Sequence, residues 1–398
     1  MPEIKPEVET FAKIKVIGVG GGGGAAVNRM IQSKIRGVDF ITINTDVQAL
    51  HYSLAPTKLH IGKTTTRGLG AGMNPDLGLR SAEESQNEIR EALKGSDMVF
   101  ITCGMGGGTG SGAVPLIAEV AKEMGALTIA VATKPFSFEG SQRMAIAEEA
   151  LDKLVDRVDT VITIPNDRIL QIIDKKTGLL EAFNIVDDVL QQGVQGITEV
   201  ITIPGLINLD FADIKSIMGG TGSALMGIGK ASGETRAIDA AKAAISSPLL
   251  ELSIDGAKGI LFTVTGGQNL SMNEVSEAAE VITAPADPDS RVIFGANIDD
   301  TLKDELKVTV IATGFEKRLK SSASQTQKAT TYEPTPFVKT EQKDLGQGDK
   351  DKKEPMTVKA KAKSLFSKKA QEAPVATEIS SQEDKEDLDI PAFIRKKM

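Results

Sequence analysis

The sequence has 398 residues, a formal net charge of −8 and a single cysteine. That length exceeds one small hydrophobic core and predicts two packed domains with additional segments. A lone thiol excludes a disulfide framework, and two histidines without clustered cysteines argue against a zinc site. The mild acidity argues against nucleic acid as the main partner. The sequence contains neither the apolar core of a signal peptide nor an uncharged apolar run of about 18 residues, so we expect no export and no direct membrane insertion.

Strand and helix patterns alternate from Lys13 to about Lys134. The strand patterns are short and apolar, which is typical of parallel strands that are buried on both faces. This alternation predicts an open α/β sheet that binds ligands at the carboxyl ends of its strands. Strands are predicted at 14–19, 39–44, 97–102 and 127–133, and helices at 25–34, 82–94 and 114–124, which would place Pro115 in the first turn of the last helix.

A long amphipathic segment follows, with apolar residues at steps of three and four from Leu179 to Thr202. It predicts one helix about 35 Å long, which Pro204 and Gly205 end. A second α/β segment comes after it, and there Ser271 and Glu274 form a capping-box pattern at a helix start. Further elements are predicted as a helix at 237–246 and strands at 259–264, 291–294 and 306–312.

The composition changes sharply after Phe315. Lysine, serine, glutamine, glutamate, threonine and proline dominate to about Lys385, which predicts a disordered linker. The segment from Asp387 to Met398 places acids first, apolar residues in the middle and bases last, so we expect it to bind a groove on a partner protein. The predicted divisions are an N-terminal extension (1–12), a nucleotide-binding domain (13–178), a central helix (179–203), a C-terminal α/β domain (204–316), the linker (317–385) and the terminal peptide (386–398).

Two glycine-rich loops each lie between a predicted strand and a predicted helix, at 18–24 and 104–112. Glycine lets an anion approach backbone N–H groups at a helix start. The first loop fits G-x-G-x-x-G, so a tight turn or a dinucleotide site, with Asp46 at the ribose, are alternatives. The second loop favours a longer phosphate chain that is held from both sides. No G-x-x-x-x-G-K-[ST] pattern is present, which argues against a P-loop enzyme.

With these two loops, the sequence resembles the FtsZ family of tubulin-like GTPases. The segment Gly106–Gly112 resembles the family's signature loop, and Gly20–Gly24 its first glycine loop. Segments 164–168, 206–213 and 223–229 are similar to further family segments, and the similarity covers about 12–315 and 387–397. It implies a Rossmann-type parallel-sheet GTPase domain, joined by the long central helix to a smaller α/β domain, together with GTP or GDP as ligand, Mg²⁺ and polymerisation.

The resemblance also implies a set of nucleotide contacts. Glu139 and Arg143 would meet the ribose and phosphates, and Asn166, Phe183 and Asp187 would hold the guanine, although a solvated helix face is the alternative for Asp187. Many family members carry Asn where this chain has Ala25, which puts the turnover rate in question. The remaining positions expected at the nucleotide are Gly20, Gly21, Gly22, Gly23, Gly24, Ala25, Asn44, Gly104, Gly106, Gly107, Gly108, Thr109, Gly110 and Thr133.

Hydrolysis of GTP requires an oriented water molecule and a group that polarises it. The resemblance implies Asp210 and Asp213 for this role, with Asn208 positioning them. From the residues alone, these acids are better explained as an N-cap and a first-turn acid of a helix. Guanine contacts lie near the start of the long helix and Asp210 lies beyond its end, so both could reach one nucleotide only if two subunits meet head to tail.

The leading hypothesis is therefore a cytoplasmic GTPase that forms the cytokinetic ring at mid-cell. The chain would polymerise with itself and would bind membrane tethers and regulators of the FtsA, ZipA, SepF or MinC kind through Asp387–Lys397. Two alternatives stay open: a filament or scaffold protein of the same superfamily with impaired hydrolysis, and a Rossmann NAD(P) oxidoreductase.

Overall fold

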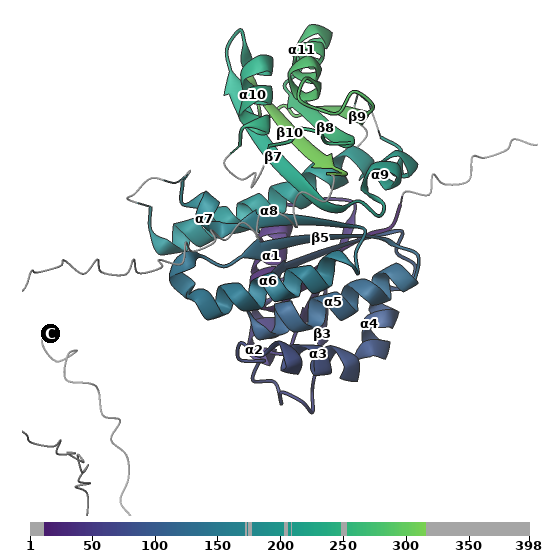
Figure 1. Cartoon of the computed structure of the whole chain (residues 1–398), viewed down its shortest axis with the longest axis vertical. Coiled ribbons are helices and arrows are strands. Elements are labelled where there is room, and N and C mark those ends of the chain that lie inside the picture. Colours follow the sequence, from purple (N-terminus) through teal and green to yellow (C-terminus); the bar gives the residue numbers. More distant parts are fainter. Residues whose placement is uncertain are drawn as a thin grey trace, which may run out of the picture. The chain divides into compact units, whose positions relative to one another are not determined.

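A ten-stranded sheet runs through the chain in the order β3-β2-β1-β4-β5-β6-β7-β10-β8-β9 (Figure 1). It is seen in a computed structural model that describes residues 12–171, 173, 177–202, 206–207, 209–247 and 253–315. The strands are β1 Ile14–Val19, β2 Val38–Asn44, β3 Thr57–His60, β4 Met98–Gly104, β5 Leu127–Lys134, β6 Thr160–Pro165, β7 Gly222–Ser232, β8 Gly259–Gly266, β9 Arg291–Ile298 and β10 Glu305–Thr313.

The helices cover this sheet on both faces, as an open α/β sheet requires. They are α1 Gly20–Gln32, α2 Val47–Tyr52, α3 Pro75–Glu84, α4 Gln86–Leu93, α5 Gly108–Glu123, α6 Ser141–Val155, α7 Asn166–Ile169, α8 Leu179–Thr202, α9 Phe211–Met218, α10 Arg236–Ile245 and α11 Met272–Thr283, with a short 3-10 turn η1 at Ser137–Glu139.

The first six strands are parallel, and their apolar residues are buried on both sides. One core lies between these strands and α3, α4, α5 and α6. Another core lies on the opposite face, where α1 and α8 pack. In the predicted parallel register, the carboxyl ends of β1, β4 and β5 therefore meet at one edge, directly before the starts of α1 and α5.

The second half of the sheet is mixed. β10 is antiparallel to both β7 and β8, whereas β8 and β9 are parallel. Helices α10 and α11 bury one face of these strands. Residues of α8 and α9 share a core with the other face and with the first half of the sheet, so α8 packs against both halves.

The two halves join where β6 pairs with β7. Only three residue pairs connect these strands, Thr160–Ile162 with Gly222–Ala224. The two α/β segments predicted from the sequence are thus confirmed, and backbone hydrogen bonds link them into one sheet across this narrow connection.

Helix α8 has the bounds that its apolar periodicity predicts, and the capping box of Ser271 and Glu274 at α11 is confirmed. Three predictions were wrong in detail. α1 and α5 begin at Gly20 and Gly108, well before the predicted starts, so Pro115 lies inside α5 and not in its first turn. The single helix predicted at 82–94 is two helices, because the chain breaks at Ser85.

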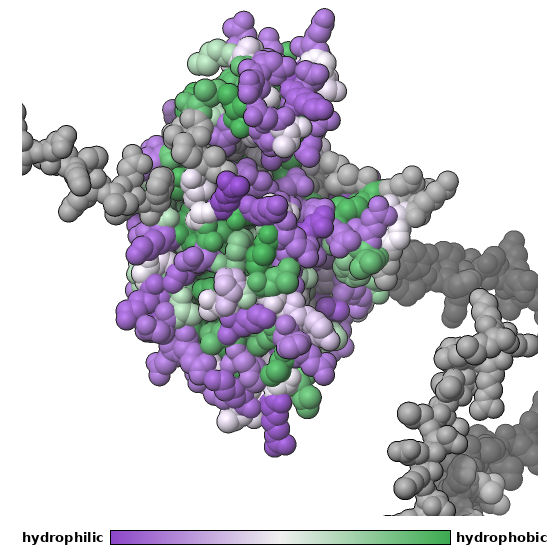
Figure 2. Space-filling model, turned by 180° about the vertical axis from the view of Figure 1, so that it is seen from behind, coloured by the Kyte–Doolittle hydropathy of each residue, from purple (hydrophilic) through white to green (hydrophobic). Residues whose placement is uncertain are grey.

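No helix in the described ranges is long and apolar enough to cross a membrane. Figure 2 shows the face opposite to that of Figure 1, where hydrophilic residues surround smaller apolar patches. The predicted extension up to residue 11, the linker (317–385) and the terminal peptide (386–398) lie outside the described residues, as does Asn208.

Candidate nucleotide-binding site

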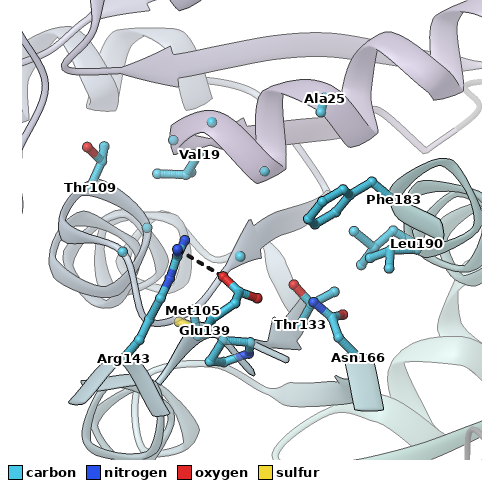
Figure 3. Close-up of a pocket in the computed structure, with 18 of the residues that line it drawn as sticks. Val19, Ala25, Met105, Thr109, Thr133, Glu139, Arg143, Asn166, Phe183 and Leu190 are labelled. Atoms are coloured by element: carbon cyan, nitrogen blue, oxygen red, sulfur yellow. Dashed lines mark ion pairs between the residues drawn. The ribbon is translucent and has the colours of Figure 1, made fainter. Parts of the chain in front are cut away.

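A cavity of about 420 Å³ lies where the carboxyl ends of β1, β4 and β5 meet α1, α5, α6, α7 and α8. Its walls bring together most residues that the sequence predicts at the nucleotide (Figure 3). Those that line it are Gly20, Gly21, Gly22, Ala25, Gly104, Gly107, Gly108, Thr109, Gly110, Thr133, Glu139, Arg143, Asn166, Phe183 and Asp187.

Helices α1 and α5 start at the glycine loops of this cavity without a side-chain cap. Val19 precedes α1 and Gly107 precedes α5, no side chain accepts a capping hydrogen bond at either start, and neither first turn contains an acid. The backbone N–H groups of a helix's first turn lack intrahelical acceptors and carry partial positive charge. Two such starts at one cavity form a site for an anion with more than one charged group, such as a chain of phosphates.

Glycine is required at specific points of this cradle. Gly20 has a φ of +72°, which lets β1 turn directly into α1. A Cβ on Gly110 would lie 2.6 Å from the carbonyl oxygen of Gly104, so glycine also lets α5 approach β4. By contrast, a Cβ on Gly21 or Gly107 would meet no protein atom within 4 Å, because both positions border open space.

Four of the predicted positions do not line the cavity. A Cβ on Gly23 would lie 2.3 Å from the Thr102 carbonyl oxygen, and Gly24 lies near the side chain of Thr42. Asn44 is buried and its Oδ1 accepts a hydrogen bond from the Asp46 N–H. The fourth residue, Gly106, has a φ of +88° and donates its N–H to Ser111 Oγ at 2.8 Å. In this structure all four shape the loops that hold the lining residues.

One wall of the cavity is polar. Arg143 Nη1 lies 2.9 Å from Glu139 Oε2, and Glu139 also accepts the Phe136 N–H at 2.8 Å. Figure 3 shows both side chains reaching into the cavity from the same side. Arg143 Nε and Asn166 Oδ1 are buried and have no hydrogen-bond partner among the described residues. Because such groups are costly to leave unpaired, they are expected to be satisfied by a ligand or water.

The other wall comes from α8. Phe183 is 41% exposed, and it lies edge-on to Phe136 with 5.7 Å between ring centroids. Asp187 follows one helical turn later. Burial, together with the charge of Asp188, raises the pKa of Asp187 to about 6, and Arg29 opposes that shift. An aromatic face beside a carboxylate suits a planar base with hydrogen-bond donors on its edge.

Several apolar lining residues were missed by the sequence analysis. Val186 and Leu190 could have been found, because they lie three and seven residues after Phe183 on the same stripe of α8. Nothing in the local sequence marks Val19, Met105 or Pro135, which reach the cavity through the ends of their strands.

Asp210 and Asp213 do not line this cavity. The Asp210 carboxylate accepts the Ala212 N–H at 3.2 Å at the start of α9, which confirms the capping interpretation. Both acids are exposed. Figure 1 shows α7, beside the cavity, and α9 at opposite ends of α8, so a single chain keeps these acids apart from the cavity.

Asp46 does not act as the ribose acid of a dinucleotide site in this structure. Its Oδ1 caps α2 by accepting hydrogen bonds from the N–H groups of Gln48 and Ala49 at 2.8 and 3.3 Å. It is also absent from the cavity wall. The dinucleotide alternative therefore loses the acidic residue on which it depends.

Comparisons with known proteins agree with this arrangement. The model of the "Tubulin/FtsZ family, GTPase domain" matches residues 13–174, and that of the "FtsZ family, C-terminal domain" matches 222–316. An FtsZ dimer from M. jannaschii is 45% identical with a TM-score of 0.75, over 78% of this chain and 90% of that one. An FtsZ point mutant from the same organism is 45% identical with a TM-score of 0.74, over 76% and 91%.

A more distant structure shares the fold. CetZ2 from Haloferax volcanii, described as a GTPγS-bound protofilament, is 20% identical with a TM-score of 0.65, over 78% of this chain and 95% of that one. The family models and the identity to FtsZ carry the assignment. This chain belongs to the FtsZ family and is a tubulin-like GTPase that binds GTP or GDP, usually with Mg²⁺, and assembles into filaments.

Proposed function

We propose that GTP in the cavity is hydrolysed when a second copy of the chain supplies Asp210 and Asp213 to it, head to tail. The observation that carries this proposal is the exposure of both acids at the start of α9, away from the cavity of their own chain. The 24 residues of α8 correspond to about 35 Å, which is too far for one nucleotide to contact both ends. A head-to-tail contact that does not close produces an open filament.

The nucleotide's orientation follows from the walls of the cavity. The phosphates would bind the uncapped starts of α1 and α5, and the base would lie between Asn166, Phe183 and Asp187. Asp187 would accept the N1–H and N2–H₂ groups of guanine, a pair that adenine lacks. Arg143 Nε and Asn166 Oδ1, which are buried without partners, fit a polar ligand here.

Mg²⁺ fits this site through the phosphates. The described residues contain no cluster of three or more His, Cys, Asp or Glu side chains that could hold a metal alone. Mg²⁺ keeps several waters and is commonly bound through substrate phosphates. The hydroxyl of Thr109, which hydrogen-bonds Thr45 Oγ1 at 2.7 Å at the start of α5, lines the cavity and could support the ion. When bound, Mg²⁺ would supply positive charge that offsets the charge of the phosphates.

Complementation between two inactive variants tests catalysis in trans. Asp210→Ala should bind GTP but lose hydrolysis by about 100-fold or more. Asp187→Ala should lose GTP binding but still carry Asp210 and Asp213. A mixture of the two should recover phosphate release, because the empty subunit supplies the acids to the loaded one. Asp239→Ala, at an exposed first-turn acid of α10, is the matched control and should behave as the parent.

Two outcomes would overturn this proposal. One is an Asp210→Ala protein that releases phosphate at the parent rate. The other is a parent protein whose rate per molecule is equal in dilute monomeric solution and in concentrated solution. In addition, sedimentation with GTP should exceed sedimentation with GDP, and pelleting that ignores the nucleotide would contradict assembly driven by GTP.

We infer that the filaments form the division ring at mid-cell and reach the membrane through Asp387–Lys397. The support is the sequence order of acids, apolar residues and bases in that peptide, which suits a partner's groove. Partners would be tethers or regulators of the FtsA, ZipA, SepF or MinC kind. Deletion of 387–398 should spare GTP-dependent filaments and abolish mid-cell localisation. Normal localisation of the deletion would refute this role.

A second candidate is a filament whose hydrolysis is impaired, which the small side chain of Ala25 at the cavity wall favours. Steady phosphate release by the parent protein would exclude it. If release is slow, Ala25→Asn should accelerate it without a comparable change in GTP affinity.

A further inference from the structure

An ion pair joins α1 to α8 close in sequence to residues that line the cavity. Arg29 Nε lies 2.5 Å from Asp188 Oδ1, and Nη2 lies 3.1 Å from Oδ2, so the pair is bidentate. Arg29 comes one helical turn after Ala25, and Asp188 follows Asp187, and both Ala25 and Asp187 line the cavity. This pair therefore ties the helix that begins at the phosphate end to the helix that carries the base contact.

Among the described residues, two charges act on Asp187, while the paired Glu139 and Arg143 lie on the other wall of the cavity. Asp188 on its own helix repels a charge on Asp187, and Arg29 on α1 attracts it. On the neighbouring α7, Asn166 is uncharged and the Asp167 carboxylate accepts hydrogen bonds from Ser137. Burial is the main reason that the pKa of Asp187 is raised to about 6. The charges of Asp188 and Arg29 modify that pKa in opposite directions.

We propose that Arg29 and Asp188 are positioning residues that set how strongly, and down to what pH, Asp187 selects guanine. This inference rests on the proposed guanine contact of Asp187. An ionised carboxylate accepts both N1–H and N2–H₂ of guanine, whereas a protonated carboxyl group donates one O–H and loses that match. Selectivity is therefore retained while Asp187 is charged and declines as the pH falls through its pKa.

The two members of the pair should act in opposite directions. Removing the Arg29 charge leaves two adjacent carboxylates without their cation, which raises the pKa of Asp187 further. Removing the Asp188 charge takes away a repelling carboxylate and leaves Arg29 to interact with Asp187, which lowers that pKa. A purely structural tie between α1 and α8 predicts the same direction for both variants, because each breaks the same link.

The test measures binding of GTP and of inosine triphosphate from pH 5 to 8. The two ligands carry the same triphosphate, so the ratio of their dissociation constants cancels phosphate titration and reports the N2–H₂ contact. The parent ratio should be about 10-fold or more at pH 8, as expected for a hydrogen bond to a charged acceptor. It should fall toward one as the pH drops below about 6.

In Arg29→Gln the midpoint of this decline should move up, and in Asp188→Asn it should move down by a larger amount, because Asp188 has the stronger influence on Asp187. Arg29→Lys keeps the charge without the bidentate geometry and should retain a midpoint close to that of the parent. Arg90→Gln breaks the exposed pair with Glu123, seen at 2.8 Å on α4 and α5, and serves as the control with the parent profile. Melting curves verify that each variant is folded.

The outcomes separate the inference from the function on which it rests. If Arg29→Gln and Asp188→Asn move the midpoint in the same direction, or leave it unchanged, the positioning role is overturned. If Asp187→Asn keeps the parent ratio at every pH, the guanine contact itself is wrong. If Asp187→Asn binds GTP and inosine triphosphate equally, and the midpoints of Arg29→Gln and Asp188→Asn move in opposite directions, the guanine contact and the positioning role are both supported.

Discussion

The helix starts of the two halves of this molecule differ in how their backbone N–H groups are satisfied. At the cavity, α1 and α5 begin with glycine and have neither a capping side chain nor an acid in the first turn. In the C-terminal half, Asp210 caps α9, and Ser271 with Glu274 forms a capping box on α11, while α10 has no capping side chain but has Asp239 in its first turn. At α1 and α5 the proposed ligand supplies the negative charge, whereas at α9 and α11 the protein itself supplies it.

In the first half, each helix that starts away from the cavity has either a capping side chain or a first-turn acid, and α4 has only the acid, Glu88. Asp46 caps α2 and Asn74 caps α3. Among the helices whose N-cap is described, α1, α5 and α6 lack both a capping side chain and a first-turn acid, and the first turn of each contributes residues to the cavity wall.

The largest expected effect concerns the C-terminal half. Arg236, the first residue of α10, is only 5% exposed, and its guanidinium binds the Glu274 carboxylate, with Nε 2.6 Å from Oε1. Arg236→Met leaves that carboxylate without its cation and should lower the free energy of unfolding by about 3–5 kcal/mol. Urea denaturation measures this. A change as small as that of Arg90→Met, at an exposed pair, would show that the protein does not depend on this buried contact.

A pair of glycine variants separates folding from ligand binding within one loop. Gly23→Ala places a Cβ 2.3 Å from the Thr102 carbonyl oxygen and should cost about 1–3 kcal/mol of stability. Gly21→Ala meets no protein atom within 4 Å, so its melting temperature should stay at the parent value while GTP affinity falls. Equal melting temperatures for the two variants would contradict the packing role of Gly23. Unchanged GTP affinity in Gly21→Ala would contradict the place of Gly21 at the ligand.

A cap variant gives a smaller effect. Asp46→Ala removes the acceptor for the N–H groups of Gln48 and Ala49 and should lower stability by about 1 kcal/mol. Preference for GTP over NAD should not change, since Asp46 does not line the cavity. Competition binding with both nucleotides measures this preference, and a gain or loss of NAD affinity would revive the dinucleotide alternative.

The smallest expected effect is at Cys103. This thiol is buried at the end of β4, and burial raises its pKa to about 12. Because the thiolate is the reactive form, the native protein should resist alkylation at pH 8 and react fully in denaturant. Rapid labelling of the folded protein would show that the strand end opens more readily than its packing implies.

The sequence predicted α8 and four of the six parallel strands, because apolar periodicity reports directly on burial, but β3 and β6 were missed. It placed the starts of α1 and α5 too late, since glycine has low helix propensity. Packing overrides that propensity here: a Cβ on Gly112 would lie 2.0 Å from the Pro75 carbonyl oxygen, so only glycine allows α5 to approach α3. Strand β7, with glycines throughout, was missed because its long pairing with β10 and not its side chains makes it a strand.

The candidate site was predictable in part. The glycine loops indicate anion binding from residues alone, and the capping role of Asp210 follows from ordinary helix rules. That Asn166, Glu139 and Phe183 lie at one cavity could be predicted only from the family resemblance, since these residues lie on separate elements. The contact between Arg29 and Asp188 spans 159 sequence positions, and no local pattern marks it.

The three-pair connection between β6 and β7 has a mechanical consequence. Each of the other strand pairs in the sheet is held over four or more residue pairs, so a force that pulls or twists the two halves is resisted least at this seam. If neighbouring subunits in a filament pull on both ends of the chain, bending would concentrate between β6 and β7. Helix α8, which packs against both halves of the sheet, would then hold the halves together.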